Sequence, residues 1–171
     1  AFKKDIFQRM GGFDERFTVA NNEDTDFSYR LAKAGHKLVF NPEAFVYHTH
    51  PDTLGKYLKV KFWRGYWRIV VYHRYPNKAV KDSYTPGIIK IQTLLMTIFL
   101  ALISLSIFVP RMVYLSLLFC FILMLSSLPF SLKVFRKQKV LGLISAVFIF
   151  LRALVFSVGG FLGFVRCLLK P

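Results

Sequence analysis

The residues best suited to chemistry in this chain are carboxylates gathered at the start of a predicted helix. Residues 11–31 read GGFDERFTVANNEDTDFSYRL and hold five of the nine acidic side chains of a protein with 24 basic ones. Glu23, Asp24 and Asp26 are crowded together, and neighbouring carboxylates raise one another's proton affinity, which favours proton transfer near neutral pH. Acidic residues in a first helical turn also complement the helix dipole, which would be a purely structural role. The local pattern leaves both interpretations open.

Histidines form a second group of candidate ligands. His48 and His50 lie just past a predicted strand over residues 43–48 (EAFVYH), where they could contact a metal ion or a phosphate. Paired histidines at this spacing are also common without any ligand, so the pattern alone does not decide between the two. His36 and His73 are predicted to be structural.

The elements that position these groups follow from periodicity and capping. Phe27, Leu31 and Ala34 repeat at helical spacing, with Asn22 as a plausible N-cap and Gly35 where a helix would end. The next residues, KLVF, predict a short strand. A cationic, aromatic segment over residues 53–81 holds eight basic and no acidic side chains, which predicts a helix lying among lipid headgroups. Cations and aromatic rings also suit nucleic acid, but the apolar sequence that follows argues against it.

The second half of the chain has the composition of a membrane domain. Residues 88–171 hold nine basic and no acidic side chains, whereas a soluble surface would intersperse both charges. The runs Ile88–Val109 and Met112–Leu132 are each long enough to cross a bilayer, and Pro110-Arg111 joins them in a tight hairpin. The four cations of KVFRKQK predict that the following loop is cytoplasmic.

A third apolar run, Val140–Val165, is harder to interpret. It is long enough to span, and Gly159 and Gly163 give it a face suited to close helix packing. Arg152 stands at its middle, where a charge is costly unless it faces other helices or water. A spanning helix is preferred here over a re-entrant or interfacial segment.

The order of the motifs resembles that of a known enzyme family. GGFDE, then EDTD opening a helix, then AGHK, a strand, and a histidine after the next strand resemble the C-terminal half of the catalytic domain of family 2 glycosyltransferases, which have the GT-A fold. The resemblance covers roughly residues 1–75, and membrane helices after the catalytic domain are common in that family. It implies an α/β fold class. Residues 1–85 would be the truncated C-terminal half of a GT-A-like catalytic domain, including the interfacial helix, and residues 86–171 a transmembrane region of two to three helices.

The resemblance also implies roles for single residues. Asp24 would be the general base that takes a proton from the acceptor hydroxyl during inverting transfer. The acceptor and sugar would be contacted by Gly11, Gly12, Phe13, Asp14, Glu23 and Asp26. His48 would touch a divalent cation, Mg²⁺ or Mn²⁺, and Arg64 the donor diphosphate. FWRGYW resembles the Gln-x-x-Arg-Trp motif of processive members only loosely, because the Gln is missing and two residues separate Arg64 from Trp67.

The expected function is therefore transfer of a sugar from a nucleotide-sugar donor to a cell-envelope glycan or lipid-linked acceptor, by a multi-pass membrane protein whose catalytic part is cytoplasmic. Its partners would include membrane lipids but no nucleic acid. The family's nucleotide-binding half and Asp-x-Asp metal motif do not precede Ala1, so this chain is expected to be a C-terminal fragment that is inactive alone. The alternative is a non-enzymatic small membrane protein with a cytoplasmic binding or scaffolding module.

Overall fold

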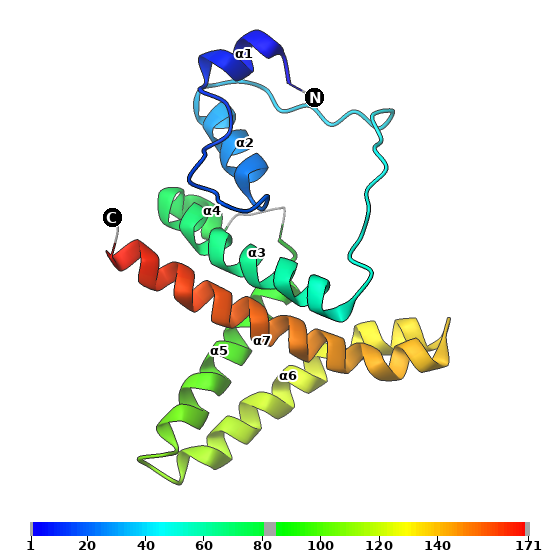
Figure 1. Cartoon of the computed structure of the whole chain (residues 1–171). Helices are drawn as coiled ribbons and strands as arrows, with labels where there is room; N and C mark the ends of the chain where they lie inside the picture. The colour runs from blue at the N-terminus through cyan, green and yellow to red at the C-terminus, as the bar shows by residue number, and fades with distance from the viewer. Residues whose placement is uncertain (1, 81–84, 170–171) are drawn as a thin grey trace.

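A computed structural model describes residues 2–80 and 85–169. Throughout these ranges the regular elements are helices, arranged as a small N-terminal unit above a group of long helices (Figure 1). Their bounds are α1 Lys4–Arg9, α2 Glu23–Lys33, α3 Leu54–Arg74, α4 Pro76–Val80, α5 Gly87–Leu105, α6 Met112–Phe135 and α7 Lys139–Leu169.

The predicted α/β fold class is wrong for the described residues, because neither predicted strand forms. Residues 37–40 and 43–48 lie in an irregular connection between α2 and α3. A strand is stable only when a neighbour pairs with its backbone N–H and C=O groups, and the described chain provides none. The apolar side chains of this connection are consequently exposed, with Val39 at 84% and Tyr47 at 102%.

Phenylalanine rings hold the N-terminal unit together. Phe27 of α2 is fully buried and lies 4.9 Å from Phe2, 5.1 Å from Phe7 and 5.5 Å from Phe13 between ring centroids. Aromatic pairs at these separations contribute about 0.5–1.5 kcal/mol each beyond their burial. The rings therefore fix α1 and the GGFDE loop on one face of α2.

The helix predicted over residues 53–81 is interrupted at Tyr75 and followed by α4, and residue 81 lies outside the described residues. The prediction is confirmed for α3. Its N-cap Thr53 accepts a hydrogen bond from the backbone N–H of Lys56 at 3.3 Å, and the helix ends one residue before Tyr75-Pro76. Because proline has no N–H to donate and disfavours a helical residue before it, this boundary is encoded locally.

Helix α3 packs along α7, which is the most extensive contact between elements (Figure 1). Gly65 of α3 faces the backbone of Phe156, while Gly159 and Gly163 of α7 face the backbones of Phe62 and Tyr66. A methyl group on any of these three glycines would collide with a main-chain carbonyl. The predicted close-packing role of Gly159 and Gly163 is thus confirmed, and their partner is α3.

Helices α5 and α6 form the predicted hairpin and meet α7 around a small core of Met96, Leu123 and Ala153. The helices α5, α6 and α7 are each long and apolar enough to cross a membrane, which indicates a membrane protein. Arg152 is sheltered as expected, since its guanidinium donates a hydrogen bond to the side-chain oxygen of Gln92 on α5.

Candidate functional site

Arg30 fastens the GGFDE loop to α2. Its guanidinium donates hydrogen bonds to the carbonyl oxygens of Met10 at 2.6 Å and Gly12 at 2.5 Å, and it forms an ion pair with Asp26 at 3.0 Å. Gly11 and Gly12 adopt left-handed backbone conformations, with φ of 73° and 65°, which glycine tolerates best. The loop is therefore a rigid structure rather than a free turn.

Arg74, at the end of α3, joins two of the predicted site carboxylates. Its Nη1 lies 2.7 Å from Oδ2 of Asp14 and 3.1 Å from Oδ1 of Asp26, whose side chain is only 1% exposed. Burial alone would raise the pKa of Asp14, but hydrogen bonds from Arg16 and Arg74, with the charge of Arg74, hold that pKa well below its usual range. Asp14 is accordingly ionised, and through Arg74 and Arg30 the two carboxylates connect the loop, α2 and α3.

Asp24 differs from these two carboxylates because it is exposed on the first turn of α2. Its Oδ1 accepts a hydrogen bond from the backbone N–H of Thr25 at 2.7 Å and lies 3.3 Å from the Thr25 hydroxyl. No cation of the described chain forms an ion pair with it. Asp24 is thus oriented by its neighbour and open to a ligand.

Glu23 is half-buried, and its Oε2 has no hydrogen-bond partner among the described residues. A buried carboxylate oxygen without a partner is costly, so such atoms usually have a further role. A hydroxyl group of a bound ligand would satisfy it.

Two asparagines, Asn21 and the predicted N-cap Asn22, attach the start of α2 to α3. The Asn21 amide donates to the carbonyl oxygen of Val60 at 3.1 Å, and the Asn22 amide lies 3.4 Å from that of Arg64. Asn22 precedes the helix as predicted, but its side chain makes no capping hydrogen bond. Periodicity could not identify these contacts, because their partners are about 40 residues away.

An open cleft of about 930 Å³ lies beside the start of α2. His48, His50 and Arg64 line it together with Asn21, so the predicted metal-contacting and diphosphate-contacting residues share one cavity. Asp24 is not among the lining residues, but Asn21 places the start of α2 at the rim. The Nδ1 of His48 lies 2.9 Å from the carbonyl oxygen of Thr49.

The described residues do not assemble a complete set of metal ligands. No group of three or more histidine, cysteine or acidic side chains comes together in the part of the chain that is described. The one carboxylate in the cleft, Asp52, forms an ion pair with Lys56 at 2.8 Å. The metal role of His48 therefore stays a prediction without support from this donor set.

Comparisons with known proteins agree with the motif order. The family model for glycosyl transferase family group 2 matches residues 1–158. Pre-mycofactocin glycosyltransferases from two strains of Mycobacterium tuberculosis, CDC 1551 / Oshkosh and ATCC 25618 / H37Rv, are each 36% identical to the chain over 70 residues. The aligned part covers 41% of this chain but only 14% of each relative. No solved structure matches the chain. On the extent of the family match, the chain belongs to the glycosyl transferases of family group 2.

Proposed function

We propose that this chain supplies the acceptor side of an inverting glycosyltransferase that works at the cytoplasmic face of a membrane. The donor would be a nucleotide sugar and the acceptor a cell-envelope glycan or lipid. The observation that carries the proposal is Asp24: it is the exposed, oriented carboxylate of the EDTD segment, whereas Asp14 and Asp26 are engaged by Arg74.

In this mechanism the Asp24 carboxylate takes the proton of the acceptor hydroxyl. The hydroxyl oxygen attacks the anomeric carbon from the face opposite the leaving group, and the bond from that carbon to the nucleoside diphosphate breaks. The diphosphate leaves with the bonding electrons, and the sugar is joined to the acceptor with inverted configuration. Arg64, in the cleft beside α2, would offset the negative charge that builds up on the leaving diphosphate.

The other predicted residues would bind the ligand or hold the loop beside it. Glu23 would bind a hydroxyl of the acceptor or sugar through its buried Oε2. Gly11, Gly12 and the partly exposed ring of Phe13 would border the ligand, while Asp14 and Asp26 hold the loop in place. We propose this holding role in place of direct sugar contact, because both carboxylates already have charged partners.

The test uses the enzyme in its full-length form. Asp24→Asn preserves the shape and the hydrogen bonds to Thr25 but removes the basic oxygen, so kcat should fall at least about a hundredfold, the range of a general base. Glu15→Gln, which removes a nearby carboxylate from the GGFDE loop, is the matched control and should retain near-normal turnover. Near-normal turnover of Asp24→Asn would contradict the assignment.

A further inference from the structure

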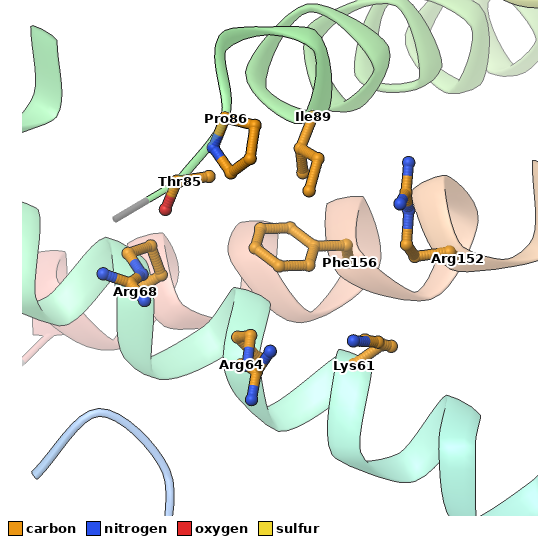
Figure 2. A pocket seen from close by; sticks show the side chains of 8 residues that line it. All are labelled: Lys61, Arg64, Arg68, Thr85, Pro86, Ile89, Arg152 and Phe156. Atoms are coloured by element: carbon orange, nitrogen blue, oxygen red, sulfur yellow. The ribbon is translucent and has the colours of Figure 1, made fainter. Parts of the chain in front are cut away.

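A second pocket, of about 270 Å³, lies where α3, α7 and the beginning of α5 meet (Figure 2). Its walls carry Lys61, Arg64 and Arg68 from α3 and Arg152 from α7. The start of α5 closes one side with Pro86 and Ile89. No acidic residue lines it within the described chain, so four cations surround one small volume.

Two of these cations are not neutralised by the described residues. The ammonium of Lys61 and the guanidinium of Arg64 make no hydrogen bond or ion pair with another described side chain. Burial, and then the charges of Arg64 and Arg152, lower the pKa of Lys61. Cations that repel one another in a half-buried space are stabilised by an anion, and a phosphate group can accept hydrogen bonds from several of them at once.

An apolar groove of about 330 Å³ adjoins this pocket and shares Arg152 with it. It runs between the end of α6 and the first half of α7, and its walls include Phe130, Val134, Ile144 and Phe148. On α3 it begins at Tyr57, one helical turn before Lys61. The cationic pocket and the apolar groove therefore follow each other along the α3–α7 contact.

The position of this pair of cavities agrees with the depth of a lipid headgroup. The pocket lies where the first apolar helix begins, and the groove lies where the hairpin returns at the end of α6. Phosphates of a bilayer lie at the boundary between apolar chains and water, which is the boundary that these helix ends mark.

We propose that the pocket and groove bind one lipid that ends in a phosphate group, with the phosphate held by Lys61 and Arg152 and the start of the apolar chain lying against Ile144 and Phe148. The site goes beyond glycosyl transfer, because it requires neither the sugar donor nor the Asp24 carboxylate. A terminal phosphate suits it best, since a phosphate monoester carries about −1.5 to −2 charges at neutral pH and several cations line the pocket.

The chain purified in neutral detergent provides the test, with short-chain phosphatidic acid, diacylglycerol of the same acyl length and inorganic phosphate as probes. Phosphatidic acid should bind saturably, diacylglycerol should not, and inorganic phosphate should bind at least about tenfold more weakly because it cannot use the groove. Lys61→Gln should weaken phosphatidic acid about tenfold by removing one charge-assisted hydrogen bond. Lys59→Gln, which removes an exposed cation of the same helix outside both cavities, is the matched control and should change little.

A second variant separates a lipid from a soluble phosphate. Ile144→Trp fills the apolar groove from an exposed position. It should therefore weaken the binding of phosphatidic acid and leave the binding of inorganic phosphate unchanged. Equal binding of both phosphates, with no effect of Ile144→Trp, would overturn the lipid and leave an anion site. Equal losses of affinity for phosphatidic acid in Lys61→Gln and Lys59→Gln would show that the pocket is not the binding site. Because no sugar donor is present, neither result depends on whether Asp24 is the base.

Discussion

At the scale of single residues, the carboxylates of the motif region divide into two groups with different partners. Asp14 and Asp26 share the guanidinium of Arg74, whereas Asp24 faces solvent with only Thr25 to orient it. Sequence spacing places all three near one another but does not reveal this division. It depends on Arg74, which is 48 residues away from Asp26 in the chain and belongs to a different helix.

Within the first group, Asp14 makes the stability of the fold depend on pH. The folded-state pKa of Asp14 lies below the unfolded value of about 3.9, so its ionised form stabilises the fold at neutral pH, and this contribution is lost as the pH falls from about 4 toward the folded pKa. Asp14→Asn should lower the free energy of unfolding by about 1.5–3 kcal/mol at pH 7, the range for hydrogen bonds to charged groups. That deficit should shrink below about pH 4, as measured by chemical unfolding in detergent.

Asp52→Asn is the matched control for this measurement. It removes a carboxylate whose ion pair with Lys56 is exposed, and exposed pairs contribute at most about 1 kcal/mol. A deficit of Asp14→Asn that stayed constant from pH 7 to pH 3 would show that the carboxylate is not held ionised by Arg16 and Arg74.

At the scale of elements, the longer helices were predicted correctly from the sequence, whereas the two predicted strands were wrong and α1 and α4 were not predicted. Periodicity and capping identified α2, and apolar length identified α5 and α6, because these signals are local. Residues 37–40 have the composition of a strand, but pairing needs a partner that composition cannot supply. The hydrogen bond from the Asn21 amide to α3 was missed for the same reason, because its partner comes from another helix. The same holds for the pocket that Lys61 of α3 and Arg152 of α7 line together.

The contact between α3 and α7 yields a sharp prediction from two adjacent glycines. In Gly159→Ala the new methyl group would collide with the carbonyl of Phe62, so the helices must separate at a cost of about 1–3 kcal/mol. In Gly160→Ala the nearest atom outside its own helix is the Ile69 Cγ1 at 3.5 Å, an ordinary contact, so the better helix propensity of alanine should stabilise by up to about 1 kcal/mol. In thermal unfolding in detergent, the midpoint temperature should therefore fall for Gly159→Ala and rise for Gly160→Ala. Equal shifts would show that the helices are not packed backbone to backbone.

At the scale of the whole molecule, the same contact bears on how the chain crosses the membrane. Helix α7 is long enough to span a membrane, as the sequence predicted. It nevertheless lies along α3, a helix that carries the cations Lys61, Arg64 and Arg68. Drawing α3 into the bilayer would cost about 2.5–3.5 kcal/mol for each central cation. We therefore expect α5 and α6 to cross while α7 stays beside α3 at the interface, in place of the spanning arrangement that the sequence favoured.

Labelling with an impermeant thiol reagent checks this arrangement in a variant without Cys120 and Cys167. A cysteine at Arg111, in the turn between α5 and α6, should react from the outer side, and one at Lys137 should be protected. A cysteine at Leu168, near the end of α7, should behave like Lys137. Reaction of Leu168 from the outer side would show that α7 spans, and reversal at Arg111 and Lys137 would invert the whole topology.

The asparagine amides that join α2 to α3 also link the height of Asp24 above the bilayer to the position of α3. Because Asn21 and Asn22 are hydrogen-bonded to the backbone of α3, which packs along α7, we expect the Asp24 carboxylate to keep a nearly fixed height above the lipid surface. With Asp24 as the proposed base, we expect the enzyme to prefer acceptors whose hydroxyl group lies at that height above the headgroups. We expect acceptors with a shorter or a longer tether between lipid and hydroxyl group to be used less well.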